Sequence, residues 1–152
     1  MIDLKSLIDN FESSVRVLRS AYFCLDVKLK AKQSTSFGKG HAFTPPEKRK
    51  YLKELVKLIK QSYSGPKFCG LIRITLIYSF PWRKIDKGRE SLGWVLMSSH
   101  VDLDNLHKPV LDALEGILFN DDCKVVVSRE MKIRSSFSGV AILVDEIVAK
   151  RT

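Results

Sequence analysis

Residues 102–122 have the sequence DLDNLHKPVLDALEGILFNDD, in which apolar side chains recur at the spacing of a helix between two acidic ends. This periodicity predicts a helix that begins near Asp104, which can cap it, and ends around Phe119. Its predicted buried face consists of Leu106, Val110, Leu114, Ile117 and Leu118. The opposite face carries Asp104, Lys108 and Asp112, which follow one another at intervals of four residues and therefore stack along one side.

Patterns on both sides of this helix predict the element order α-β-α-β-α-β-β. The further predicted elements are an amphipathic helix at 3–19, a strand with Phe23, Leu25, Val27 and Leu29 inward, a basic helix capped by Thr44, a strand at 71–80, a strand with Val125, Val127, Met131 and Ile133 inward, and a strand at 140–144. Residues 82–101 are predicted to form a long connection without regular structure. The expected fold is one α+β or mixed α/β domain with a sheet of about four strands and helices packed on it. Residues 1–20 form its N-terminal helix and residues 21–152 its main part.

The composition is that of a globular domain, since 45% of the 152 residues are hydrophobic and 28% are charged. The sequence contains no apolar run long enough to cross a bilayer and no signal peptide, so a cytoplasmic protein without a membrane partner is expected. Cys24, Cys69 and Cys123 have no metal-ligand spacing and are predicted to be buried thiols.

Positive charge is concentrated between Lys28 and Lys60, where ten lysines and arginines oppose two glutamates in a chain of net charge +9. Such a segment suits a polyanion, because phosphates that bind lysine and arginine release their counterions. A solvated face is the alternative. The residues predicted to contact DNA are Lys28, Lys30, Lys32, Lys39, Lys48, Arg49, Lys50 and Lys53.

Asp102, Asp104 and Asp122 offer the hard oxygen ligands that magnesium prefers, provided that the chain brings both ends of the helix together. Magnesium, or manganese in its place, would then activate a phosphodiester for cleavage. Lys108 could place positive charge near the transition state. Asp112 and Asp121 are secondary acidic candidates.

Simpler interpretations remain open for the same residues. The first two aspartates could be helix-cap residues, the Asp104, Lys108 and Asp112 series an exposed ion-pair ladder, and the acidic step at 121–122 a turn. His100 could add a transition-metal ligand. Trp82 and Trp94 could stack on bases or anchor the long connection.

The run from Asp102 to Asp122, followed by Cys-Lys-Val-Val, resembles the signature of the RusA family of Holliday junction resolvases. The segment Ala42-Phe43-Thr44-Pro45 before a basic helix is also similar to that family, and the resemblance covers about residues 21–147. The N-terminal helix precedes the family pattern, and residues 30–37 lack its proline- and arginine-rich loop.

The resemblance implies a homodimeric endodeoxyribonuclease that uses magnesium to make paired, symmetric nicks in four-way DNA junctions during recombination and repair. It assigns the metal-binding catalytic carboxylates to Asp102, Asp104 and Asp122 and the catalytic lysine to Lys108. Two alternatives remain: a nuclease for branched or flapped DNA without junction specificity, and a non-catalytic DNA-binding module.

Overall fold

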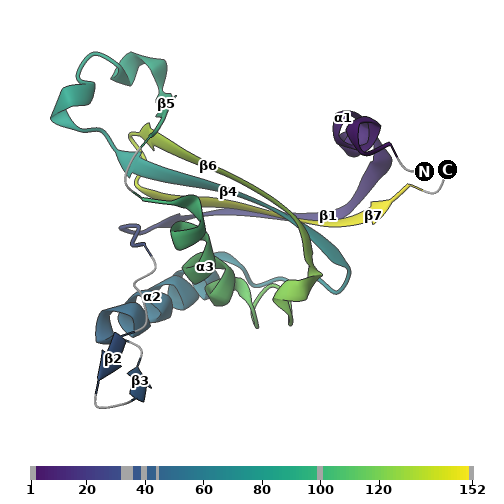
Figure 1. The fold of residues 1–152 in the computed structure, drawn as a ribbon, viewed down its shortest axis with the longest axis horizontal. Coiled ribbons are helices and arrows are strands. Elements are labelled where there is room, and N and C mark those ends of the chain that lie inside the picture. Colours follow the sequence, from purple (N-terminus) through teal and green to yellow (C-terminus); the bar gives the residue numbers. More distant parts are fainter. Residues whose placement is uncertain (1–2, 32–35, 39–40, 44, 99–100, 151–152) are drawn as a thin grey trace.

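The computed structural model describes residues 3–31, 36–38, 41–43, 45–98 and 101–150. Its helices and strands, drawn in Figure 1, are α1 (Leu4–Ser14), β1 (Val15–Asp26), β2 (Ser36–Gly38), β3 (His41–Phe43), α2 (Pro46–Ser62), β4 (Leu71–Pro81), β5 (Trp94–Leu96), α3 (Leu103–Leu114), β6 (Val125–Ser135) and β7 (Gly139–Ala149). Three short 3-10 helices are η1 (Lys84–Asp86), η2 (Glu90–Leu92) and η3 (Asp122–Lys124). The predicted α+β class is confirmed.

The main sheet has five strands in the order β1-β7-β4-β6-β5, one more than the sequence predicted. Strands β4 and β6 are parallel, and the other neighbouring strands are antiparallel. A parallel pair needs a crossover, which here includes α3. Strands β2 and β3 form a separate two-stranded sheet.

Helices α2 and α3 pack on one face of the main sheet, and the hydrophobic core lies between them and the strands (Figure 1). The spacing of apolar residues in α2 predicts a buried stripe of Tyr51, Leu52, Leu55, Val56 and Ile59. The structure confirms it, because Tyr51, Leu55 and Ile59 are buried and Leu52 and Val56 are half-buried. The basic side chains of α2 lie on its other side, as the spacing predicts. The predicted cap, Thr44, lies outside the described residues.

We call the opposite face of the sheet the open face, because α2 and α3 do not cover it. Strand β6 has a bulge near its start, because its register against β4 shifts between Ile72 and Arg73 and leaves one extra residue in β6. The bulge changes which side chains of β6 face the helices. After this bulge, Val127, Met131 and Ile133 lie on the open face and not inward as predicted. Met131 is 40% exposed. A bulge reverses which side chains point inward, and the alternation read from sequence could not show it.

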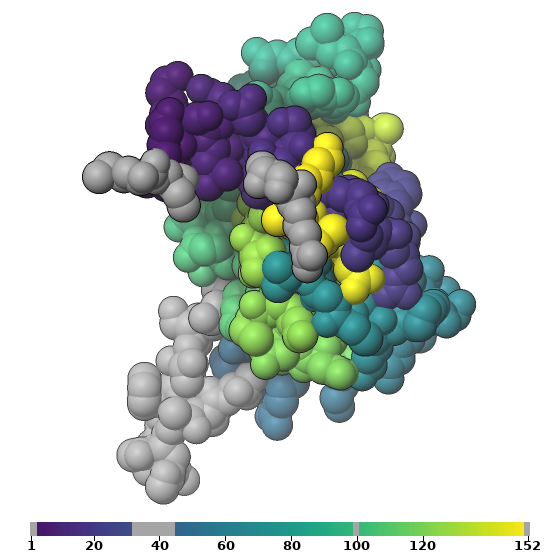
Figure 2. All heavy atoms as spheres, turned by 90° about the vertical axis from the view of Figure 1, so that its right-hand side faces the viewer, coloured from purple at the N-terminus to yellow at the C-terminus, as the bar shows by residue number. Residues whose placement is uncertain are grey.

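The N-terminal helix is shorter than predicted, because β1 begins at Val15 and continues to Asp26. The β-branched Val15 and Val17 pair with the end of β7 in antiparallel register. Lys150 N also donates to Ser14 O at 2.9 Å, so the end of β7 lies beside the junction of α1 and β1. Helix α1 has no buried residue and occupies one corner of the molecule, over the open face (Figures 1 and 2).

The long connection before α3 is more ordered than predicted, since it contains η1, η2 and the edge strand β5. Asp86 anchors it: its buried carboxylate accepts from Arg83 N at 3.0 Å and lies 3.5 Å from Arg134 Nε. Hydrogen bonds from Arg83 hold the pKa of Asp86 below its usual value. Trp82 is half-buried, which favours an anchor, whereas Trp94 is 54% exposed.

Helix α3 ends at Leu114, one turn before the predicted end. Gly116 then has a φ of +85°, a left-handed conformation that glycine adopts without strain. Leu118 and Phe119 are still buried, but they follow the turn and do not belong to the helix. The early turn sends the chain back toward α3.

All three cysteines are free and exposed, which corrects the prediction of buried thiols. Cys24 lies on the open face of β1, Cys69 precedes β4 and Cys123 lies in η3. None of the helices described here has the length and apolar character needed to span a membrane.

Candidate active site

Asp102 and Asp104 lie at the N-terminal end of α3. Asp102 occupies the N-cap position with extended backbone (φ −75°, ψ 146°), but its side chain makes no capping hydrogen bond. Asp104 is in the first helical turn, so the two residues do not share the extended stretch that the sequence analysis assumed. Both side chains are exposed. The helix dipole favours negative charge at this end, which makes two carboxylates tolerable there.

Lys108 connects the middle of α3 with the segment that enters β6. Its ammonium lies 2.7 Å from Asp112 Oδ1 and 3.8 Å from Asp122 Oδ2. The hydrogen bond to Asp112 is the main cause that raises the pKa of Lys108, so the group stays charged at neutral pH. The structure therefore brings Lys108, Asp112 and Asp122 together.

A cluster of carboxylates surrounds Asp122. Ligand oxygens of Glu115, Asp121 and Asp122 lie within 4.8 Å of one another. Among the described residues, Asp102, Asp104 and Asp122 do not form such a group. Glu115 was not foreseen, because the sequence placed it inside a longer helix, whereas it directly follows the end of α3.

Besides contributing negative charge, Asp121 has a local structural role. Its carboxylate accepts from Cys123 N at 2.9 Å and caps η3, which agrees with the turn interpretation of this residue. This hydrogen bond lowers the pKa of Asp121. The neighbouring Asp121 carboxylate also raises the pKa of the Cys123 thiol, which disfavours the thiolate that a nucleophile requires.

His107 is a second residue that the sequence did not single out. Its ring Nδ1 contacts Glu130 of β6, and both residues line a surface pocket together with Leu103, Asp104 and Ser128. Glu130 points toward α3 because of the bulge in β6. The pair joins α3 to the sheet beside Asp104, within one helical turn of Lys108. His100 lies outside the described residues.

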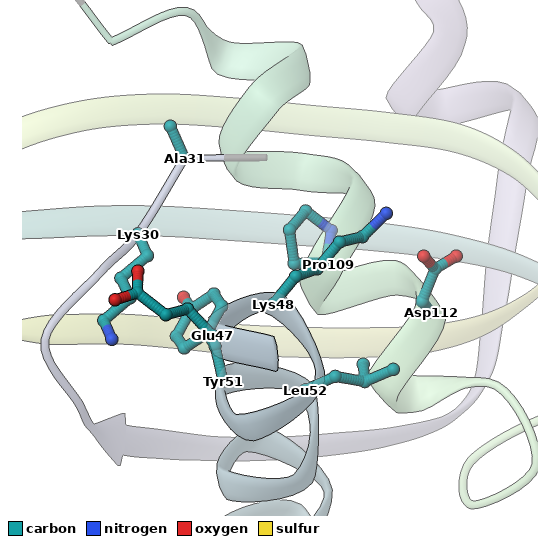
Figure 3. A pocket seen from close by; sticks show the side chains of 8 residues that line it. All are labelled: Lys30, Ala31, Glu47, Lys48, Tyr51, Leu52, Pro109 and Asp112. Atoms are coloured by element: carbon teal, nitrogen blue, oxygen red, sulfur yellow. The ribbon is translucent and has the colours of Figure 1, made fainter. Parts of the chain in front are cut away.

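Among the described residues, two of the predicted DNA-binding lysines, Lys30 and Lys48, lie beside α3. Arg49, Lys50 and Lys53 are exposed on the outer side of α2, and Lys28 is exposed after β1. Lys30 and Lys48 line a pocket between α2 and α3 together with Asp112 (Figure 3). The basic surface of α2 thus adjoins the acidic side of α3. Lys32 and Lys39 lie outside the described residues.

The salt dependence of DNA binding tests the basic surface. We expect Lys50→Ala/Lys53→Ala to weaken binding to any DNA and to reduce the slope of log K against log salt by about one unit per lost phosphate contact. The measurement is fluorescence anisotropy over a salt titration. The double variant Lys5→Ala/Lys150→Ala removes two lysines at the opposite end of the molecule and should keep the wild-type slope. An unchanged slope in the α2 variant would mean that these lysines are only solvated.

The carboxylates at this site are the kind of ligand that magnesium prefers. Carboxylate oxygens are the only side-chain ligands in the group of Glu115, Asp121 and Asp122, all of which reach solvent. Asp102 has no hydrogen bond to the helix that would occupy its oxygens as a cap. Magnesium takes a few carboxylates and completes its coordination with water and phosphate, so partial exposure suits it.

Comparison with protein families gives a match to the model described as endodeoxyribonuclease RusA, over residues 26–145. The matched region contains every residue of the acidic and basic surfaces described above and begins at the end of β1. Helix α1 and most of β1 precede it. Comparison with curated proteins gave no match.

Proposed function

Because the chain belongs to the RusA endodeoxyribonuclease family, we propose that this nuclease resolves four-way DNA junctions by paired, symmetric nicks. Magnesium, or manganese, is its proposed cofactor. Its proposed setting is DNA recombination and repair in the cytoplasm, and its proposed working form is a homodimer.

One observation carries this proposal: Lys108 lies between Asp112 of α3 and Asp122 of the segment entering β6. The last turns of α3, a turn and a loop separate Lys108 from Asp122 in the sequence. The fold nevertheless brings Lys108 Nζ to within 3.8 Å of Asp122 Oδ2. A cation beside a carboxylate cluster on an exposed surface suits a phosphodiester substrate, since the metal and the lysine can both oppose its negative charge.

From the resemblance to the family, we propose that Asp102, Asp104 and Asp122 hold the metal, although among the described residues Asp122 forms a group with Glu115 and Asp121 and not with the other two. When bound, magnesium supplies Lewis acidity that polarises the phosphodiester and lowers the pKa of water. Lys108 opposes the charge that develops on the phosphoryl oxygens, and Asp112 holds the lysine side chain in place through their ion pair. Asp121 keeps the backbone of η3 in position through its hydrogen bond to Cys123 N.

The basic residues of α2 give DNA a path to this site. Lys50 and Lys53 are exposed on α2, and Lys48 of the same helix lines the α2–α3 pocket with Asp112, so a duplex arm that contacts Lys50 and Lys53 can extend toward Lys108. A homodimer would supply two such surfaces and two sites. Its two-fold symmetry would match that of a four-way junction, and each protomer would cut one of two related strands.

Cleavage of three labelled DNA substrates tests the proposed function. With magnesium, the protein should nick a four-way junction symmetrically on two strands and leave linear duplex intact, and without a divalent metal it should bind but not cut. Equal cleavage of flaps would favour the alternative of a branched-DNA nuclease. Binding without cleavage in both magnesium and manganese would favour a non-catalytic module and contradict the proposal.

A further inference from the structure

Lys132 of β6 holds the chain that leads into α3. Its backbone carbonyl accepts from Met97 N at 3.0 Å, directly after β5. Its side chain is half-buried, and its ammonium donates to Val101 O at 2.6 Å. Val101 immediately precedes Asp102. Lys132 therefore ties the backbone in front of the first predicted metal ligand to the main sheet.

The hydrogen bond from Lys132 restrains the backbone of Asp102 itself. The carbonyl of Val101 and the N–H of Asp102 belong to one planar peptide group, so fixing the carbonyl oxygen also fixes the orientation of that group. Hydrogen bonds from charged donors are shorter and stronger than neutral ones. Within the described parts of the chain, the Lys132 ammonium makes no ion pair with a carboxylate. Its charge thus serves the peptide group before Asp102.

A second contact joins β6 to α3 further along the helix. His107 Nδ1 contacts Glu130 Oε1, and Ser128 Oγ donates to the same oxygen at 3.0 Å. The side chains of His107 and Glu130 are only 21% and 16% exposed, so solvent competes little with their contact. Asp104 lies between the two attached positions, 101 and 107. The N-terminal half of α3 is therefore held at two points against one strand.

Strand β6 also leads back to the third predicted ligand. Asp122 lies in η3, which β6 follows directly, so Asp122 and the two contacts belong to one continuous segment. Residue 101 contacts residue 132 and residue 107 contacts residue 130, because α3 runs against the direction of β6 (Figure 1). A strand paired on both sides keeps a fixed rise of about 3.3 Å per residue. The two contacts therefore set how far the start of α3 lies from Asp122.

We propose that Lys132 is a positioning residue of the active site, assisted by the contact of Glu130 with His107. Lys132 acts through the peptide group before Asp102 and keeps the carboxylates of Asp102 and Asp104 in place for the metal. The inference rests on the proposed function, which puts the metal on these two residues and Asp122. Groups that orient metal ligands without contacting the metal commonly change metal affinity or activity by about 10-fold to 100-fold.

The test is manganese binding to the free protein, measured without DNA by the electron paramagnetic resonance of unbound Mn²⁺. Lys132→Met keeps the length of the side chain and removes the donor, so the Kd for Mn²⁺ should be about 10-fold higher or more. Loss of a positive charge alone would tighten the binding of a cation, so weaker binding identifies a positioning effect. Lys132→Arg retains a charged donor and should recover most of the affinity.

Lys124→Met is the matched control. Lys124 also donates to a backbone carbonyl, that of Cys69 at 3.1 Å, but it lies at the start of β6, away from the N-terminal end of α3. The variant loses the same charge and the same kind of hydrogen bond as Lys132→Met. Its Kd for Mn²⁺ should equal that of wild type or lie below it.

Cleavage kinetics give a second readout. With saturating junction, the magnesium concentration for half-maximal nicking should rise in Lys132→Met by about the same factor as the Kd for Mn²⁺. Gel-shift affinity for the junction without metal should stay at the wild-type value, because the Lys132 ammonium is engaged with a carbonyl and not with phosphate. Amide exchange should accelerate at Leu106, whose N–H donates to Asp102 O at 3.3 Å.

Circular dichroism and thermal melting check that each variant is folded. If Lys132→Met does not fold, Lys132→Gln takes its place; its donor is uncharged and one bond shorter, so the Kd should rise several-fold. Wild-type affinity for Mn²⁺ in the variant, or equal losses in Lys132→Arg or Lys124→Met, would overturn the inference. Weaker Mn²⁺ binding by Lys132→Met in a protein that never cuts junctions would refute the proposed function alone. Junction cleavage by Lys132→Met with the wild-type dependence on magnesium would refute the inference alone.

Discussion

Asp122→Asn is expected to abolish magnesium-dependent nicking of a four-way junction while the fold survives. The substitution keeps the size of the side chain and removes the negative charge that a hard metal ligand needs. Loss of several kcal/mol of transition-state stabilisation corresponds to at least about a 1,000-fold lower rate. Stability should hold or increase, because the Asp122 carboxylate is partly exposed and lies beside those of Glu115 and Asp121, which repel it.

Cleavage of a labelled junction, gel-shift affinity and thermal melting check this result together. Junction binding should persist or tighten, because one negative charge fewer faces the phosphates. Asp102→Asn and Asp104→Asn should behave in the same way, and Asp102→Asn/Asp122→Asn should be no worse than either single change, since the groups serve one ion. Wild-type cleavage by Asp122→Asn would contradict the three-carboxylate assignment.

Glu115→Gln is the informative control for that assignment. Glu115 lies within 4.8 Å of Asp121 and Asp122, closer to them than Asp102 and Asp104 are in this structure. If Asp102, Asp104 and Asp122 hold the metal, Glu115→Gln should reduce the rate only several-fold. If Glu115→Gln lost as much of the cleavage rate as Asp122→Asn while Asp104→Asn stayed active, the metal site would have to be reassigned to the C-terminal end of α3.

Lys108→Ala is expected to slow cleavage about 100-fold to 1,000-fold while junction binding stays near normal. A charge directed at the transition state acts mainly on the chemical step, and loss of one such donor has an effect of about this size. Because Asp112 raises the pKa of Lys108, its charge should be constant across neutral pH, so the wild-type rate should show no titration of this lysine there.

Single-turnover cleavage and fluorescence anisotropy separate the two effects of Lys108→Ala. Lys124→Ala is the matched control, because Lys124 lies next to the acidic step at 121–122 but its ammonium donates to Cys69 O at 3.1 Å. It should retain cleavage. Equal losses of binding and cleavage in Lys108→Ala would make Lys108 a phosphate anchor and not a catalytic residue.

Much of the fold followed from periodicity, because the two helices and four long strands that form the core have strong patterns. The order of the three helices and the four long strands and the buried stripe of α2 were predicted correctly, whereas the short strands β2, β3 and β5 were not predicted. Features that depend on strand pairing were not predicted. The start of β1 at Val15, the short strand β5 and the bulge in β6 all depend on partner strands that are distant in the sequence. The early end of α3 depends on a left-handed glycine, which the helical pattern obscured.

The sequence predicted the types of residue in the candidate site better than it predicted their arrangement in space. The sequence analysis expected Asp122 to return to the start of the helix, beside Asp102 and Asp104. The structure brings Asp122 to within 3.8 Å of Lys108, in the middle of α3, and among the described residues it does not place the three aspartates in one group. The contribution of Glu115 was not predictable, because it depends on the position where α3 ends. The contact of His107 with Glu130 was missed for another reason: the bulge turned Glu130 to the unexpected face of β6.

The position of β7 between β1 and β4 also constrains how the protein folds. Among the described strands, β7 comes last in the sequence, yet it pairs with the first, and Val15 is matched with Ala149. Closing so long a loop costs entropy before any contact is gained, so the nascent chain must keep β1 unpaired until β7 emerges. We expect α2, β4, α3 and β6 to assemble first, followed by β7 and β1. During that interval, the unpaired edges of β1 and β4 are the part of the chain most exposed to aggregation.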